Sequence, residues 1–232
     1  SLTGKENKSL AEKWLPKIAT GESTACVALN EFIGEREDNG LTIKDNKISG
    51  ISIFAIDGEV NPDFIITAVD NDLYLVEIEN DNVEISPLPT IDSTRVMTEL
   101  VFHSSQAQKI SGGIELINKV IDSGRVVLSA DMLGAAQNML DRAVEYSLER
   151  KQFNRIIGSF QAVKHMCAEM AADLEPCRSL VWYASYAQND IPEEAHLTAC
   201  HAKAHLSEVT HDIARVATQV HGGMGFTDLL GL

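Results

Sequence analysis

A short segment near the middle of the chain places three cations close to an aromatic ring and a long amide. The cations are Arg150, Lys151 and Arg155, the ring is Phe153, and the amide is Gln161. A guanidinium holds an anion through charge and hydrogen bonds, and an aromatic or guanidinium face can stack on a flat ligand. The segment therefore predicts either a binding corner for an anionic, aromatic molecule or a solvated connection between two helices.

A glycine cluster near the end of the chain is the second candidate for binding chemistry. It has the sequence Gln219-Val-His-Gly-Gly-Met-Gly and follows a segment with helical apolar spacing. Glycine accepts positive φ and lets the backbone approach a ligand closely. One glycine would suffice to cap the helix, whereas Gly222, Gly223 and Gly225 exceed that need. The cluster predicts either an extended helix cap or a turn against which a ligand packs.

Other patterns for catalysis or metal binding are weak. His201 and His205 share one predicted helical face, but the residue after His201, which is Glu in zinc-protease motifs, is Ala202, and we expect no metal site. No Gly-x-Gly-x-x-Gly motif follows a predicted strand, and no Gly-x-Ser-x-Gly motif is present. Asp122 and Asp131 are expected at a helix start or on the surface. No catalytic base is therefore named.

The predicted secondary structure that positions these residues changes from strands to helices near Phe102. Before it, short apolar or alternating runs separated by turn signals predict an antiparallel barrel or sandwich. The predicted strands begin at Cys26, Leu41, Ile51, Phe64 and Leu73. After it, helical periodicity dominates. We therefore predict an α+β fold with three parts: a helical segment at residues 1–23, a β-domain at 24–103 and a C-terminal helical bundle at 104–232.

Two long helices are predicted to flank the cationic segment, at about 122–149 and 159–188, with a serine as N-cap of the second. An apolar stripe in steps of three and four runs along the second helix. Its members are Phe160, Val163, Cys167, Met170, Leu174, Cys177, Val181 and Ala184. This spacing is typical of core packing in a helical bundle. Cys167 and Cys177 are accordingly interpreted as small buried hydrophobic residues rather than nucleophiles.

Composition narrows the classes of partner. The chain has 232 residues and a net charge of −15, from 19 basic and 34 acidic residues. Such a charge argues against nucleic acid or an anionic membrane as the main partner. An anionic cofactor would need a local basic patch, which residues 150–155 provide. The four cysteines lack paired spacing, and no signal peptide or run of about 18 apolar residues occurs, so we expect a cytoplasmic protein with reduced thiols.

Residues 149–163 and the glycine cluster together resemble two motifs of the acyl-CoA dehydrogenase family, in the family's order. The first motif is Glu-Arg-Lys-Gln-Phe-Asn-Arg-Ile-Ile-Gly-Ser-Phe-Gln-Ala-Val and the second is Gln-Val-His-Gly-Gly-Met-Gly-Phe-Thr. The resemblance covers nearly the whole chain and begins partway into the family's N-terminal helical domain. It implies that residues 1–23 are a remnant of that domain and that the chain is truncated or processed.

The resemblance also implies a cofactor and a reaction. The cofactor is FAD, and the residues implied to bind it are Arg150, Phe153, Gln161, Gln219, Gly222 and Gly223. In the family, the corner residues reach the flavin of a neighbouring subunit, which implies a homo- or hetero-oligomer. The reaction is α,β-dehydrogenation of an acyl-CoA thioester, by removal of the α-proton and transfer of the β-hydride to FAD. An electron-transfer flavoprotein is the implied electron acceptor.

Three hypotheses remain open at this point. The first is a flavin-dependent acyl-CoA dehydrogenase whose catalytic base lies outside the given sequence. The second is a non-catalytic subunit of a heteromeric acyl-CoA dehydrogenase that completes the FAD site of a partner. The third is a helical scaffold without a cofactor.

Overall fold

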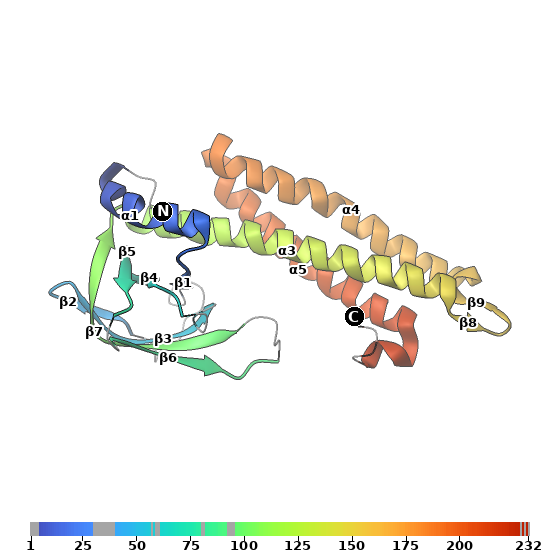
Figure 1. Ribbon diagram of the computed structural model, residues 1–232. Helices are drawn as coiled ribbons and strands as arrows, with labels where there is room; N and C mark the ends of the chain where they lie inside the picture. Colours follow the sequence, from blue (N-terminus) through green and yellow to red (C-terminus); the bar gives the residue numbers. More distant parts are fainter. Residues whose placement is uncertain are drawn as a thin grey trace. The chain divides into compact units, whose positions relative to one another are not determined.

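A computed structural model gives the arrangement of the chain as two compact units, residues 1–119 and 120–232 (Figure 1). The residues that it describes are 5–29, 40–56, 58, 61–79, 82–91, 96–227, 229 and 231. Each unit has its own core and is considered by itself.

The first unit begins with a short helix that packs on a sheet. A 3-10 turn, η1 (Lys5–Asn7), leads into α1 (Lys8–Thr20). Gly21 ends the helix in a left-handed conformation, with φ of 74°, and its N–H donates to the Ile18 carbonyl. The buried ring of Trp14 lies 4.5 Å, centroid to centroid, from that of Phe64. This aromatic contact fixes α1 to the strands.

Seven strands form the sheet of this unit. They are β1 (Ala25–Ala28), β2 (Thr42–Lys44), β3 (Lys47–Ile56), β4 (Phe64–Val69), β5 (Asp72–Glu77), β6 (Val83–Leu88) and β7 (Met97–Ile110). Their order is β2-β3-β1-β4-β5-β7-β6, and β7 also pairs with β3. That extra pairing closes β3, β1, β4, β5 and β7 into a ring, so the sheet is a small barrel. Its interior includes fully buried Ile48, Ile65, Val76 and Leu100.

Two features of the sheet correct the sequence analysis. β1 and β4 pair in parallel, from Ala25 opposite Phe64 to Ala28 opposite Thr67, so the barrel is not purely antiparallel. The parallel pairing is possible because β2 and β3 intervene in the chain and supply the crossover. In addition, neither β6 nor β7 was predicted as a strand, and β7 runs beyond Phe102 to Ile110. The second half of β7 is rich in polar residues, so its sequence pattern did not indicate a strand.

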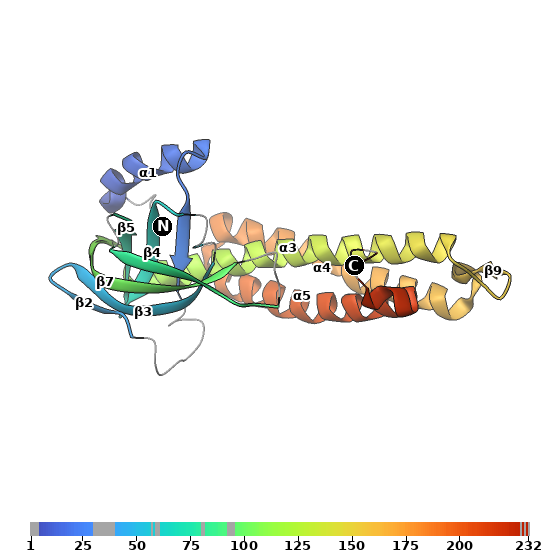
Figure 2. The same ribbon diagram turned by 60° about the horizontal axis from the view of Figure 1, so that its bottom comes forward.

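Three long helices dominate the second unit, and they run side by side in both ribbon views (Figure 2). They are α3 (Gly113–Glu149), α4 (Gln161–Asp190) and α5 (Pro192–His221). Two short strands, β8 (Lys151–Gln152) and β9 (Arg155–Ile156), and the 3-10 turn η3 (Ile157–Ser159) join α3 to α4. A further 3-10 turn, η4 (Gly222–Phe226), follows α5. The predicted combination of a small β-barrel and a helical C-terminal region is confirmed.

The core of this unit lies along the predicted stripe of α4. Met170, Leu174, Cys177, Val181 and Ala184 are buried, whereas Phe160, Val163 and Cys167 are half-buried. Burial raises the pKa of the Cys167 and Cys177 thiols. The interpretation of both as apolar packing residues agrees with this environment.

Two helix boundaries differ from the predicted ones. α3 begins at Gly113 rather than near Asp122, so Asp122 lies inside the helix, where it is buried. It is neither a helix-start nor a surface residue, whereas Asp131 is exposed as expected. Ser159 does not cap α4, because Phe160 occupies that position and the Ser159 hydroxyl instead donates to the Ile156 carbonyl at 2.6 Å. The three predicted domain boundaries stay a prediction.

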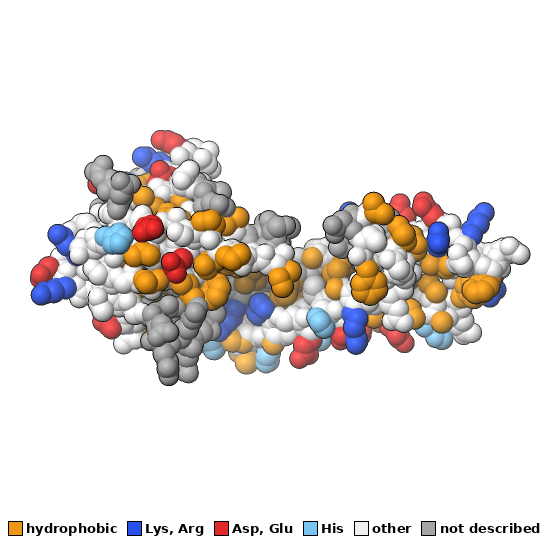
Figure 3. All heavy atoms as spheres, turned by 90° about the horizontal axis from the view of Figure 1, so that it is seen from below, with side chains coloured by type: hydrophobic (Ala, Val, Ile, Leu, Met, Phe, Trp, Pro, Cys, Tyr) orange, Lys and Arg blue, Asp and Glu red, His pale blue; other side chains and the backbone are white. Residues whose placement is uncertain are grey.

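None of the described helices is both long enough and apolar enough to cross a membrane. On the face drawn in Figure 3, basic side chains are scattered and form no broad basic field. An anionic ligand would therefore depend on a local basic group rather than on a broad positive surface.

Candidate functional site

The cationic corner is a two-residue hairpin between α3 and α4. Lys151 pairs with Ile156 and Gln152 with Arg155, and the two residues between them, Phe153 and Asn154, both have positive φ. Two successive left-handed residues are the geometry of a type I′ turn, which suits asparagine and is uncommon for phenylalanine. The Phe153 ring is 87% exposed. The turn therefore holds an aromatic ring out into solvent.

Two further contacts fix the base of the corner. The Ile157 N–H donates to the Arg150 carbonyl at 2.8 Å, which ties the hairpin to the end of α3. The Arg155 guanidinium lies 3.8 Å from the centroid of the Phe160 ring, a cation–π contact. Phe153 meets the same ring edge-on at 6.2 Å. Arg155 and Phe153 are thus arranged around Phe160.

The glycine turn follows directly from the end of α5. Gly222 has φ of 61°, and its N–H donates to the Gln219 carbonyl. A Cβ on Gly225 would lie 2.6 Å from the Thr218 carbonyl oxygen, so η4 packs on α5 only with glycine there. A Cβ on Gly222 or Gly223 would meet nothing within 4 Å. Gly225 has a packing role, whereas the backbone at Gly222 and Gly223 is open to approach.

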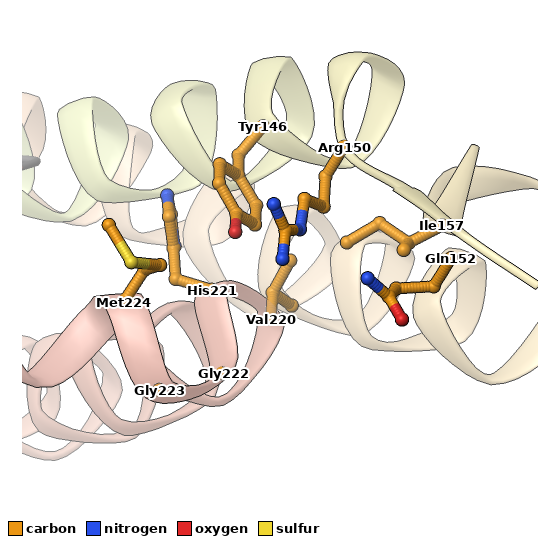
Figure 4. A pocket seen from close by; sticks show the side chains of 9 residues that line it. All are labelled: Tyr146, Arg150, Gln152, Ile157, Val220, His221, Gly222, Gly223 and Met224. Atoms are coloured by element: carbon orange, nitrogen blue, oxygen red, sulfur yellow. The ribbon is translucent and has the colours of Figure 1, made fainter.

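The corner and the glycine turn line the same cavity, which has a volume of about 340 Å³ (Figure 4). Arg150 contributes from the end of α3, and Gly222 and Gly223 contribute from the turn. The other lining residues are Tyr146, Gln152, Ile157, Val220, His221 and Met224. In Figure 4 the Arg150 side chain extends between Tyr146 and Ile157 toward Val220. Among the described residues, no carboxylate forms an ion pair with its guanidinium.

Three of the six predicted site residues lie elsewhere. Gln219 lines a second cavity of about 600 Å³ on another side of the turn, together with Gly222 and Phe226. Phe153 and Gln161 line neither cavity. Gln161 is exposed in the first turn of α4, with its amide nitrogen 3.4 Å from His165 Nε2. Arg150, Gly222 and Gly223 thus line one cavity. Gln219 lines the second cavity, and Gly222 lines both.

Six of the nine residues that line the first cavity were not predicted as site residues, among them the two rings of Tyr146 and His221. Tyr146 lies in the last turn of α3, four residues before Arg150, whose N–H donates to the Tyr146 carbonyl. This spacing places both side chains on one side of the helix end. That spacing could have identified Tyr146. His221 belongs to the quoted glycine motif, but its burial could not be anticipated, and its Nδ1 lies 2.8 Å from the Ala217 carbonyl oxygen.

Comparison with known protein families accounts for this arrangement. Residues 111–232 match the family model described as acyl-CoA dehydrogenase, C-terminal domain. The chain belongs to the acyl-CoA dehydrogenase family. The match includes both the corner and the glycine turn, so the two motifs that meet at the cavity lie within the shared domain.

Curated relatives support the same family. The subunit CarC of the caffeyl-CoA reductase-Etf complex of Acetobacterium woodii is 37% identical over 118 residues, 51% of this chain and 31% of that protein. The 3-(aryl)acrylate reductase of Clostridium sporogenes is 30% identical over 241 residues, 93% of this chain and 63% of that protein. This chain therefore spans less than two thirds of the length of these two relatives.

A solved structure shows that the fold is shared as well. Butyryl-CoA dehydrogenase from Megasphaera elsdenii has a TM-score of 0.82 and 22% identity, over 95% of this chain and 63% of that one. The match includes both the barrel and the helices. The β-domain of this chain is thus part of the acyl-CoA dehydrogenase fold, although the family model matches only residues 111–232, which follow the last barrel strand.

Proposed function

We propose that this chain functions in an FAD-dependent acyl-CoA dehydrogenase, and that the cavity between the corner and the glycine turn holds the FAD diphosphate. The observation that carries this proposal is the convergence of two features on one cavity. Arg150 offers a guanidinium without a carboxylate partner among the described residues, and Gly222 and Gly223 offer open backbone. A diphosphate can accept hydrogen bonds from both kinds of donor.

The size and lining of the cavity suit part of a dinucleotide. Ligand pockets commonly measure about 300–1,000 Å³, and 340 Å³ is near the lower end. The adjoining cavity beyond Gly222, with Gln219 and Phe226, could take a further part of the same molecule. Neither cavity is lined by a carboxylate from the described residues. This lining supports cofactor binding here rather than removal of a proton from substrate.

Each residue has a defined role in this proposal. FAD, when bound, supplies the hydride acceptor for α,β-dehydrogenation of an acyl-CoA. Arg150 neutralises part of the diphosphate charge in a chain of net charge −15, and Gly222 and Gly223 let the cofactor approach the backbone. Phe153 and Gln161 would contact the cofactor from the exposed side of the corner. Because they point to solvent, they suit a flavin held partly by another subunit.

The assembly is part of the proposal. We infer a homo- or hetero-oligomer that acts on an acyl-CoA. We also infer that it passes electrons to an electron-transfer flavoprotein, since the name of the Acetobacterium woodii relative describes a subunit of a reductase-Etf complex. The domain boundaries expected for it are 1–23 for an N-terminal helical remnant, 24–103 for the β-domain and 104–232 for the helical bundle.

A non-catalytic subunit that completes the FAD site of a partner is the second candidate. The environment of Asp122 favours it. This buried carboxylate accepts a 2.7 Å hydrogen bond from Arg125 and lies 3.0 Å from His196 Nδ1. Asp122 is thus engaged between α3 and α5 and lines neither cavity, and Asp131 is exposed. In this candidate, the partner chain supplies the proton acceptor.

The visible spectrum of the purified protein tests the cofactor proposal. Near-stoichiometric flavin bands would support it, and their absence after incubation with FAD would contradict it. Sedimentation velocity with detection in the flavin band tests the shared site. We expect dilution to monomer to release flavin and added FAD to restore the oligomer. A fully flavinylated monomer would contradict the shared site.

Acyl-CoA dehydrogenation by this polypeptide alone, compared with a mixture containing a second family member, separates the two candidates. Activity of the chain alone supports a self-sufficient dehydrogenase. Flavin binding and activity that appear only on mixing support the non-catalytic subunit.

A further inference from the structure

Three side chains with metal-ligand chemistry meet between α3 and α5, within the second unit. Asp122 comes from α3, and His196 and Cys200 are four residues apart on α5. One potential ligand atom from each lies within 4.8 Å of the others. No sequence motif joins them, because Asp122 and His196 are 74 residues apart. None of the three lines the cavities beside the glycine turn.

We propose that this cluster binds one zinc-type divalent cation. The ligands are His196 Nε2 and Cys200 Sγ, and Asp122 holds the imidazole through its other nitrogen. Solvent completes the coordination. The site is independent of the proposed flavin site.

The distance between the two ligand atoms carries the geometric argument. Cys200 Sγ lies 3.9 Å from His196 Nε2. A tetrahedral zinc ion with bonds of about 2.0–2.1 Å to nitrogen and 2.3 Å to sulfur separates these atoms by about 3.6 Å. A shift of a few tenths of an ångström therefore brings both atoms to bonding distance. The spacing of four residues on one helix keeps both side chains on the same face.

Asp122 supplies the outer interaction that histidine ligands of zinc require. His196 Nδ1 lies 3.0 Å and 3.2 Å from the two carboxylate oxygens of Asp122, so Nδ1–H donates to them and Nε2 keeps its lone pair. A carboxylate on the non-ligating nitrogen fixes the tautomer and the ring orientation. Arg125 donates to Asp122 Oδ1 at 2.7 Å and holds this buried carboxylate in place. Its positive charge also offsets part of the attraction for a cation.

The ligand types identify the class of cation. Thiolate and imidazole suit zinc and related transition metals, whereas magnesium and calcium require oxygen ligands. The His196 side chain is 70% exposed and Cys200 is half-buried, so water can reach the open coordination positions. Cys200 differs in this respect from Cys26 and Cys177, which are buried. The thiol releases its proton when the metal binds, so affinity should fall as pH falls.

Titration of the reduced full chain with Co²⁺, followed by competition with Zn²⁺, tests the proposal. We expect one equivalent to produce a near-ultraviolet thiolate-to-cobalt charge-transfer band, and zinc to abolish it. Cys200→Ser should remove the band, and His196→Asn should weaken or remove it. Asp122→Asn should keep the band but weaken the affinity about 10- to 100-fold. Helix content by circular dichroism establishes that each variant is folded.

Two controls on the same chain make the test specific. The double variant His201→Asn and His205→Asn removes a pair of histidines that are also four residues apart on α5, and it should leave the band unchanged. Cys167→Ser removes a half-buried thiol on α4 and should also leave it unchanged. Absence of the band from the wild-type chain, or a band that survives Cys200→Ser, would overturn the proposal. Because Co²⁺ binding is read without flavin, this outcome is independent of the proposed function.

Discussion

The phenol ring of Tyr146 stacks on the imidazole of His221, with ring centroids 4.5 Å apart and planes inclined by 29°. Tyr146 is in the last turns of α3, and His221 is the last residue of α5. The stack therefore joins the helix that carries Arg150 to the glycine turn. Both rings also line the cavity in which Arg150 and the turn meet.

Removing the stack should loosen this junction. We expect Tyr146→Leu to lower the free energy of unfolding by about 0.5–1.5 kcal/mol beyond the loss of buried area. Urea unfolding followed by circular dichroism measures the change. Tyr146→Phe is the matched control and should be close to wild type, because among the described residues the Tyr146 hydroxyl has no hydrogen-bond partner. Equal stability of the Leu and Phe variants would show that the stack contributes nothing.

Arg150 should control flavin affinity. We expect Arg150→Ala to weaken FAD binding roughly 10- to 150-fold, because each charged hydrogen bond contributes about 1.5–3 kcal/mol. Arg150→Lys should recover only part of the loss, because the ammonium group keeps the charge but cannot form the paired hydrogen bonds of a planar guanidinium. Lys151→Ala, which removes an adjacent cation outside the cavity, is the control. Wild-type flavin affinity in both Arg150 variants, measured by fluorescence titration, would remove the corner from the site.

Gly223 and Gly225 should respond differently to the same substitution. Gly225→Ala places a methyl group 2.6 Å from the Thr218 carbonyl, and we expect a loss of about 1–3 kcal/mol in unfolding free energy. Gly223→Ala meets nothing within 4 Å, so its stability should stay within about 0.5 kcal/mol of wild type. If FAD approaches the backbone there, Gly223→Ala should nevertheless weaken FAD binding. Unchanged affinity in this stable variant would exclude close approach at Gly223.

Asn7 should be a stability determinant of the first unit. Its buried amide donates to the Ser111 carbonyl at 3.1 Å and accepts from the Ser111 N–H at 2.9 Å. Asn7→Ala leaves both backbone groups without this partner, at a cost of about 1–3 kcal/mol each. Asn7→Asp keeps the acceptor and should be intermediate.

Asn138 supplies the control for that measurement. It is exposed and accepts a hydrogen bond from Arg142. Asn138→Ala should change stability by less than about 0.5 kcal/mol. Chemical unfolding of all three variants decides the ranking, and an Asn7→Ala variant as stable as Asn138→Ala would contradict it.

Cys177 should make stability depend on alkaline pH. Burial, followed by the charge of Asp173, raises the pKa of its thiol from the ordinary value of 9.0. Because the folded pKa is raised, the resulting stabilisation is present below about pH 9 and is lost as pH rises through the folded pKa. The destabilisation caused by Cys177→Ala should therefore shrink between pH 7 and pH 10. A pH-independent difference between the unfolding curves of wild type and variant would contradict the shift.

The local pattern of residues was enough to predict the two kinds of architecture. The short apolar run at Leu73 is typical of a buried strand, and the stripe from Phe160 to Ala184 has the period of a helix. Both elements exist. The glycine cluster after α5 was also predicted to end a helix, and it does so through the positive φ of Gly222. These features depend on residues that are close together in the chain, so the spacing of residue types in the sequence is enough to predict them.

Pairing between distant segments was not predictable in the same way. The parallel register of β1 with β4 depends on the crossover through β2 and β3. The strand character of the second half of β7 depends on partners in β3 and β5, because its own residues are largely polar. Local propensity is weaker than such tertiary pairing.

The amino-acid sequence by itself determined that Arg150, Gly222 and Gly223 have the chemistry to bind an anionic cofactor. Only the tertiary structure decided that they line one cavity, with Tyr146 and His221 as its wall. It also decided that Asp122 is buried beside His196 and Cys200 rather than at a helix start. The physical reason is that residue type and spacing specify what a side chain can do and which face of its helix it occupies. Contacts between helices depend on how their apolar faces pack, and this packing joins residues far apart in the chain.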